Sequence, residues 1–161
     1  MTKILLGFMG AGKTTVGRLL DPHFYDMDGL IVHQIGMSIH DFFVQEGEEA
    51  FRKVETEILE DLLENQVNII SPGGGIVLSP YNQTLLKKNP YNIYLRVDFD
   101  TIYSRLEKDM AMRRPLYLNH TRAAFKEIFE ARLPLYEALA THIIDVADKT
   151  PEEIAETIRC L

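Results

Sequence analysis

Cysteine is almost missing from this chain of 161 residues, and tryptophan is missing altogether. The one cysteine, Cys160, has no cysteine or histidine near it in a ligand pattern, so the sequence offers neither a disulfide framework nor a zinc site. None of the five histidines has the spacing of a metal motif such as H-E-x-x-H. We therefore expect Cys160 to be structurally incidental, and no zinc chemistry.

Long apolar runs are also lacking. No stretch approaches the roughly 20 apolar residues that are needed to cross a bilayer. The first strand candidate begins at Lys3, which leaves no room for a signal peptide. We therefore expect a cytoplasmic protein without a membrane partner.

Basic residues are outnumbered, with 17 Lys and Arg against 24 Asp and Glu and a formal net charge of −7. This balance argues against a nucleic-acid partner, which usually requires a basic face. Small anions are a different case, because a few cationic side chains in a low-dielectric site can bind a phosphate or a carboxylate. The positions of the arginines are therefore informative.

The length and the 46% hydrophobic content suit one well-buried core, so we expect a single domain over residues 1–161. Short apolar segments alternate with segments of helical spacing, which predicts an α/β fold in which helices cover both faces of a central five-stranded parallel sheet. The predicted strands are 3–7, 24–26, 67–70, 92–97 and 143–145. The predicted helices are 13–20, 29–35, 38–45, 48–66, 80–88, 99–108, 122–139 and 151–160.

A complete phosphate-loop motif follows the first predicted strand. Residues 7–14 read G-F-M-G-A-G-K-T, which matches G-x-x-x-x-G-K-[ST]. The glycines let backbone N–H groups converge on phosphate oxygens, Lys13 supplies a cation for the β- and γ-phosphates, and the Thr14 hydroxyl can bind Mg²⁺. Because a helix is predicted to follow, its N-terminus adds partial positive charge to the same site. A chance glycine turn is the less favoured interpretation.

One segment breaks the regular pattern. Residues 109–120 contain adjacent arginines before a proline and no sustained apolar period, which is typical of a connection inside a compact domain. In a phosphoryl-transfer enzyme we expect a mobile lid over about 109–122, because closure excludes water from the γ-phosphate. A tolerated surface loop is the alternative.

Two short motifs at predicted strand ends suggest a second substrate site. Asp26 and Asp28 are two residues apart, so we expect both carboxylates on the same side of an extended chain, facing the phosphate loop. A solvated turn is the alternative for this pair. Three glycines, Gly73, Gly74 and Gly75, follow another strand, so we expect another group to approach the backbone closely there. An ordinary flexible turn is the alternative.

Two arginines stand out on the predicted helices. Arg52 precedes Glu55 by three residues, so the acid can hold the guanidinium on one helix face. Most such pairs are solvated and contribute well under ~1 kcal/mol. Arg132 lies on a helix interrupted by Pro134, and taken alone it would also be a surface residue.

Taken together, the motifs resemble those of the shikimate kinase family over essentially the whole chain. They occur in the family's order and at near-family spacing: GFMGAGKTT, FYDMD, GEEAFRKVE, PGGG, RRPL and R-x-P-L-Y. The resemblance implies a three-layer fold of the P-loop NTPase type, similar to nucleoside monophosphate kinases, with substrate-binding helices over about 29–65. It implies Mg²⁺-dependent transfer of the ATP γ-phosphoryl group to the 3-hydroxyl of shikimate, a step in chorismate and aromatic amino-acid biosynthesis, by a monomer.

Carried onto this sequence, the resemblance also assigns site residues. Lys13, Asp28 and Arg114 are the expected catalytic residues, and Thr14 and Asp26 the expected Mg²⁺ ligands. Asp28, Arg52 and Arg132, with the glycines Gly73, Gly74 and Gly75, are expected to bind shikimate. The expected ATP-binding residues are Gly10, Ala11, Gly12, Lys13, Thr14, Thr15, Arg114 and Lys149, with Pro151 beside the base and Arg105 or Lys108 on its other side.

The chain departs from the family between Arg18 and Phe24, where the first helix and its loop are a few residues shorter than usual. An eight-residue helix descends about 12 Å, and a strand over 24–28 climbs roughly 16 Å, so the connection can close with little slack. We expect lower stability or altered ATP affinity. Two alternatives to the predicted activity are a related kinase acting on gluconate or a nucleoside monophosphate, and a nucleotide-binding module whose kinase activity has lapsed.

Overall fold

The computed structural model describes residues 1–108 and 115–161, and its centre is a five-stranded sheet. The strand order is β2-β3-β1-β4-β5, and each neighbouring pair is parallel. The strands are β1 (Lys3–Leu6), β2 (Tyr25–Asp26), β3 (Ile69–Ser71), β4 (Tyr91–Arg96) and β5 (His142–Asp145). This confirms the predicted α/β fold with a parallel sheet.

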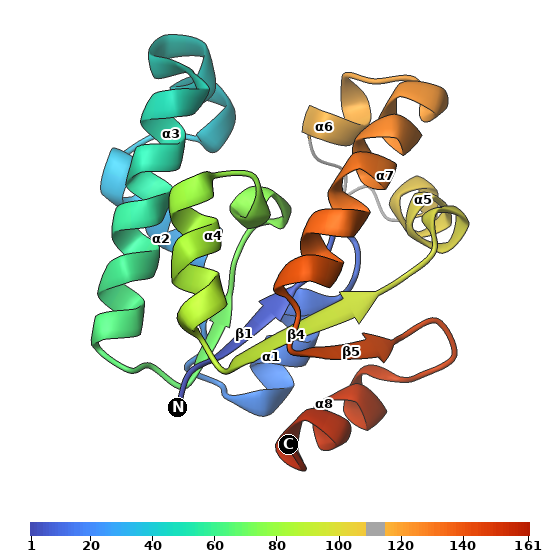
Figure 1. Cartoon of the computed structure of the whole chain (residues 1–161). Coiled ribbons are helices and arrows are strands. Elements are labelled where there is room, and N and C mark those ends of the chain that lie inside the picture. The colour runs from blue at the N-terminus through green and yellow to red at the C-terminus, as the bar shows by residue number, and fades with distance from the viewer. Residues whose placement is uncertain (109–114) are drawn as a thin grey trace.

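Helices cover both faces of the sheet. Figure 1 shows α1 and α8 below the strands, and α4 and α7 above them, which makes three layers. The helices are α1 (Lys13–Leu20), α2 (Met27–Ile35), α3 (Ile39–Glu64), the 3₁₀ turn η1 (Gly74–Val77), α4 (Pro80–Lys88), α5 (Phe99–Lys108), α6 (Pro115–Leu118), α7 (Arg122–Leu139) and α8 (Pro151–Arg159). Within the described ranges, no helix is both long enough and apolar enough to cross a bilayer.

The central strands are apolar because both of their faces are covered. Ile4, Leu5 and Leu6 of β1 have no exposed surface, and neither do Ile93 and Leu95 of β4. Parallel strands that are buried on both faces have continuous apolar sequences rather than alternating ones. The sheet therefore forms the core on which the loops at its carboxyl edge are fixed.

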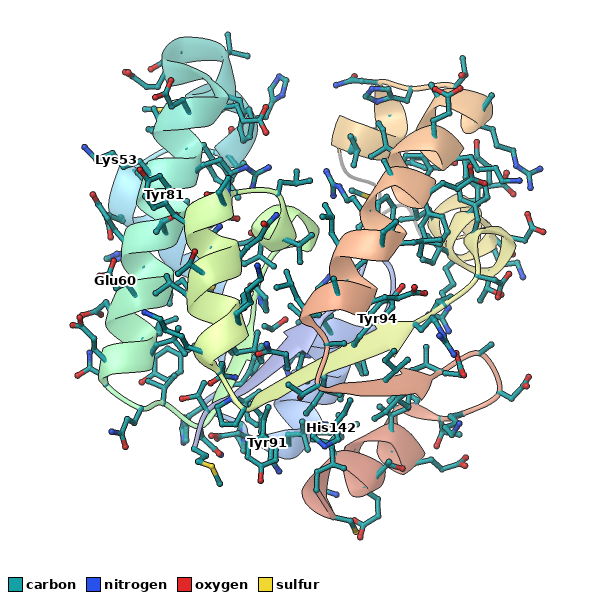
Figure 2. All side chains as sticks on the ribbon, in the orientation of Figure 1. Lys53, Glu60, Tyr81, Tyr91, Tyr94 and His142 are labelled. Atoms are coloured by element: carbon teal, nitrogen blue, oxygen red, sulfur yellow. The ribbon has the colours of Figure 1, made fainter. Side chains whose placement is uncertain are left out.

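The longest helix, α3, presents an apolar stripe to the core. Phe51, Ile58 and Leu62 are buried, whereas Lys53 and Glu60 lie on the outer side of the helix (Figure 2). This division is typical of an amphipathic helix that covers a sheet.

A break at Gly47 divides α3 into the two helices that were predicted at 38–45 and 48–66. Gly47 has φ 87° and ψ 172°, which lies outside the helical region. Glycine adopts such a positive φ at little steric cost because it has no Cβ.

The predicted geometry of Asp26 and Asp28 is wrong in one respect. Strand β2 ends at Asp26, and α2 begins at Met27, so Asp28 lies in the first turn of a helix rather than on an extended chain. The reason is that β3 pairs with β2 only through Ile70 and Ser71. Without further strand partners, the chain turns into the helix.

The short connection after α1 closes around Asp21. Its carboxylate accepts hydrogen bonds from His23 N, 2.8 Å away, and from Asn68 Nδ2, 3.1 Å away. These bonds hold the pKa of Asp21 below its usual value, with the backbone bond of His23 as the largest cause. The predicted closure is confirmed, and the effect of the short helix on stability or ATP affinity stays a prediction.

Candidate active site

The phosphate loop lies between β1 and α1, as predicted. Gly10 and Gly12 have φ values of 82° and 100°, and Gly12 is the N-cap of α1. No atom lies within 4 Å of a Cβ built on Gly12, so its backbone conformation, rather than crowding, favours glycine there. The loop therefore ends at the positive end of a helix, which favours an anion.

Lys13 lies folded against its own loop. Its Nζ donates hydrogen bonds to the carbonyl oxygens of Gly7 and Phe8, the second at 3.2 Å. A second cation braces the same loop, because Arg105 Nη1 donates to Gly10 O at 2.9 Å. Two cations thus donate hydrogen bonds to carbonyl groups of the loop.

A pocket of about 210 Å³ adjoins the loop. Lys149, from the segment before α8, and Pro151, the first residue of α8, border this pocket together with the phosphate loop and Arg105. The residues around it are Gly10, Ala11, Gly12, Thr15, Val16, Arg105, Val146, Lys149, Pro151 and Ile154. Lys108 does not border this pocket. The segments that were expected to hold the nucleotide therefore meet in one place.

The glycine turn after β3 is the second part of the site, and two side chains press against it. A Cβ built on Gly73 would lie 2.8 Å from Asp28 Oδ1, and one on Gly75 would lie 2.7 Å from Arg52 Nη2. Such distances are too short for real carbon contacts, so glycine is needed for these close approaches. The turn therefore brings Asp28 of α2 and Arg52 of α3 together.

Arg132 of α7 approaches the same turn from the other side. A Cβ on Gly74 would lie 3.5 Å from Arg132 Nη1, and the Arg132 guanidinium carbon lies 5.5 Å from the ring centre of Phe8. The hydroxyl of Tyr136 donates a hydrogen bond to Gly74 O. Burial raises the pKa of Tyr136, so this hydroxyl keeps its proton. Arg132 therefore lies between the phosphate loop and the glycine turn.

Buried polar side chains hold Arg52 from behind. Arg52 Nη1 donates to Glu55 Oε1 and Oε2 at 3.0 and 3.2 Å, which bears out the predicted pairing. Glu55 is only 2% exposed, and it also accepts from Asn82 Nδ2 at 2.9 Å. Burial raises the pKa of Glu55 above its usual value, while Arg52 and Asn82 act in the opposite direction. This pair is therefore no solvated surface pair.

The remaining predicted residues fall into two groups. Thr14 lies exposed in the first turn of α1, and Asp26 is the N-cap of α2 at the carboxyl end of β2. Arg114 and residues 109–114 of the predicted lid lie outside the described residues.

Several residues of this site were not predicted from the sequence. Phe8 under Arg132, Tyr136 behind the glycine turn, and Asn82 and Thr56 behind Glu55 were not singled out. Tyr136 could have been found from its place four residues after Arg132, one helical turn away. An asparagine inside a helix carries no such signal.

The fold and the site together define a class of protein. A phosphate loop on a parallel sheet, together with a glycine turn that one carboxylate and two guanidiniums approach, is the arrangement of a P-loop kinase with a nucleoside monophosphate kinase-like fold.

Comparison with known proteins gives the particular family. The family model for shikimate kinase matches residues 9–160. A shikimate kinase of Streptococcus gordonii (strain Challis) is 78% identical over the whole of both chains. A shikimate kinase from Acinetobacter baumannii in complex with shikimate superposes with a TM-score of 0.87 at 30% identity, covering 98% of this chain and 90% of that one. A shikimate kinase from Aquifex aeolicus gives a TM-score of 0.83 at 33% identity, covering 99% and 95%. The chain belongs to the shikimate kinase family.

Proposed function

We propose that the protein transfers the γ-phosphoryl group of ATP to the 3-hydroxyl of shikimate, giving 3-phosphoshikimate and ADP in chorismate and aromatic amino-acid biosynthesis. The observation that carries this proposal is the meeting of Asp28, Arg52 and Arg132 at the glycine turn. Shikimate carries one carboxylate and three hydroxyls, so it requires cationic and hydrogen-bonding partners on one small ring. The relative from Acinetobacter baumannii, which was solved in complex with shikimate, supports the same substrate.

On the acceptor side, the two guanidiniums suit a carboxylate. Arginine presents planar N–H groups that match carboxylate geometry, and a charge-assisted bond of this kind is stronger than a neutral one. Asp28 is the group that orients the attacking hydroxyl and accepts its proton. The bare backbone of Gly73, Gly74 and Gly75 lets the ring lie close to the turn.

On the nucleotide side, binding and charge neutralisation are the main tasks. The backbone of Gly10, Ala11 and Gly12 would hold the phosphates, with Thr15 and Lys149 further along the nucleotide. Lys13 would leave the carbonyls of its own loop and bind the β- and γ-phosphate oxygens, where negative charge spreads in the transition state. Arg114 has the same role in this proposal.

Mg²⁺ is part of the proposal. Thr14 and Asp26 offer a hydroxyl and a carboxylate, which are oxygen ligands of the kind that Mg²⁺ prefers, and Mg²⁺ is usually held by one or two such groups together with substrate phosphates. When bound, the ion supplies positive charge to the transferring phosphoryl group.

We also propose that the enzyme works as a monomer in the cytoplasm and binds no nucleic acid. Asp28, Arg52 and Arg132 come from one chain, so the acceptor pocket requires no second copy. The net charge of −7 disfavours a nucleic-acid partner. Light scattering across a range of protein concentrations would test the monomer.

A coupled assay of ADP release, with ATP, Mg²⁺ and shikimate, tests the activity. Gluconate and CMP run in parallel serve as the competing acceptors. Among the three acceptors, we expect only shikimate to support ADP release and to give a phosphorylated product. ATP-dependent stabilisation without product would instead indicate a lapsed nucleotide-binding module, and turnover with gluconate or CMP would indicate a related kinase.

A further inference from the structure

Behind Arg52 lies a buried polar layer that comes from two helices. Asn82 of α4 has no exposed surface, although its neighbour Tyr81 is 78% exposed (Figure 2). Burying an amide is costly unless its polar atoms are hydrogen-bonded. The partners of Asn82 therefore explain why a polar residue occupies this position.

Each end of the Asn82 amide has a partner on α3. Nδ2 donates to Glu55 Oε1 at 2.9 Å, and Oδ1 accepts from Thr56 Oγ1 at 2.6 Å. The Thr56 oxygen also lies 2.8 Å from the carbonyl oxygen of Arg52. A carboxylate can only accept and Oδ1 can only accept, so the amide fits this place in one orientation.

The orientation of Arg52 depends on this layer. Its Nη1 is bound by Glu55, and its Nη2 faces the glycine turn, where a Cβ on Gly75 would lie 2.7 Å away. Its Nε makes no hydrogen bond and lies 3.5 Å from Glu48 Oε1. Glu55 therefore fixes which edge of the guanidinium is offered to the acceptor.

Building on the proposed function, we propose that Asn82, supported by Thr56, is a positioning residue for acceptor recognition. Its amide fixes the Glu55 carboxylate, and Glu55 in turn directs Arg52 toward the carboxylate of the acceptor. Asn82 itself touches neither substrate in this proposal.

The charged groups around Glu55 set the expected pH dependence. Burial raises the pKa of Glu55, Asp28 of α2 raises it further, and Arg52 and the Asn82 bond lower it. Removing the Asn82 bond therefore raises this pKa, so that Glu55 becomes neutral at a higher pH. A neutral Glu55 holds Arg52 less firmly, and the acid side of the shikimate KM profile moves upward in pH.

The test is a set of steady-state profiles from mildly acidic to mildly alkaline pH. For Asn82→Leu we expect the KM for shikimate to rise roughly tenfold near neutrality. The reason is that the loss of a hydrogen bond to a charged group weakens binding by at least about one order of magnitude. The acid side of the shikimate KM profile should move to higher pH, while kcat and the KM for ATP stay within about twofold of wild type. Thr56→Val should give the same changes in the KM for shikimate and in its pH profile, but smaller ones. This variant tests the proposal if Asn82→Leu does not fold.

Two controls separate positioning from stability. Thr84→Val removes the same hydroxyl from the exposed side of α4, where its partner is Pro80 O, and should change neither profile. In a Glu55→Gln background, Asn82→Leu should cause no further movement of the acid side of the profile, because the titrating carboxyl is gone.

A lower melting temperature with an unchanged shikimate KM profile would overturn the proposal, and so would an equal rise in the KM for ATP. Wild-type protein that fails to phosphorylate shikimate would overturn the proposed function instead, so the two failures are distinguishable.

Discussion

The two halves of the site are built in different ways. The phosphate loop comes from one continuous segment, residues 7–14, that runs from the end of β1 into the first turn of α1. The acceptor half draws Asp28, Arg52, Gly73–Gly75 and Arg132 from four separate parts of the chain. A contiguous motif can be read directly from a sequence, whereas an assembled pocket depends on the whole fold. Changes in the first half should therefore act on turnover, and changes in the second on acceptor binding.

The largest expected effect is in the contiguous half. Lys13→Ala removes the cation nearest to the expected γ-phosphate, and we expect kcat to fall by at least about 10³-fold. The melting temperature should stay near that of wild type, because the hydrogen bonds from Lys13 Nζ to Gly7 O and Phe8 O lie within the phosphate loop rather than in the core. Steady-state kinetics and circular dichroism check both statements, and the exposed Lys88→Ala is the control. A near-normal kcat of the Lys13→Ala variant would show that Lys13 is not a catalytic residue.

The next effect is in the assembled half. Arg52→Ala or Arg132→Ala should weaken shikimate binding by ~1.5–3 kcal/mol, the value of a hydrogen bond to a charged group. This corresponds to roughly a ten- to hundredfold rise in the KM for shikimate, with kcat less affected. Arg18→Ala, on the exposed side of α1, is the matched control. Unchanged shikimate affinity in both variants would show that these arginines do not bind shikimate.

A smaller change tests the glycine turn. Gly75→Ala places a Cβ 2.7 Å from Arg52 Nη2, so the guanidinium must shift from the position in which Nη1 bonds Glu55. We expect the KM for shikimate to rise by about fivefold, with a modest overpacking loss of stability. The KM for ATP is the internal control and should not change. Equal affinity for shikimate would show that Arg52 adjusts without cost.

The smallest effect concerns the residue that joins the two halves. Phe8→Leu removes the ring under Arg132, and a partly exposed cation–π contact is worth about 0.5–1 kcal/mol. We expect a rise of roughly threefold in the KM for shikimate. Phe125→Leu, which loses an edge contact with the same ring but does not lie under Arg132, controls for packing. Identical kinetics of the two variants would contradict this role of Phe8.

The sequence predicted the fold well because strong local patterns agree with the tertiary structure. The apolar segment of β1 and the break between the helices predicted at 38–45 and 48–66 are local features, and the structure confirms both. The start of α2 was predicted wrongly because strand length depends on the partner strand. Only Ile70 and Ser71 are available to β2, and the local sequence does not show this.

The site shows the same limit. The pairing of Arg52 with Glu55 follows from helical spacing and was predicted. Asn82 was missed because its partners lie 26 and 27 positions earlier in the chain and on another helix. Residues that act from behind a functional group are recognised only once the packing of two elements is known.

The break at Gly47 has a consequence for the N-terminal segment of α3. The segment before it, which includes Phe43, is joined to the helix that carries Arg52 through a residue at φ 87°. One aromatic contact crosses the break, with ring centres of Phe43 and Phe51 4.7 Å apart. A side chain at position 47 would oppose this backbone angle. Such a substitution would tilt the outer turns of the helix while leaving every charged group around the acceptor chemically unchanged.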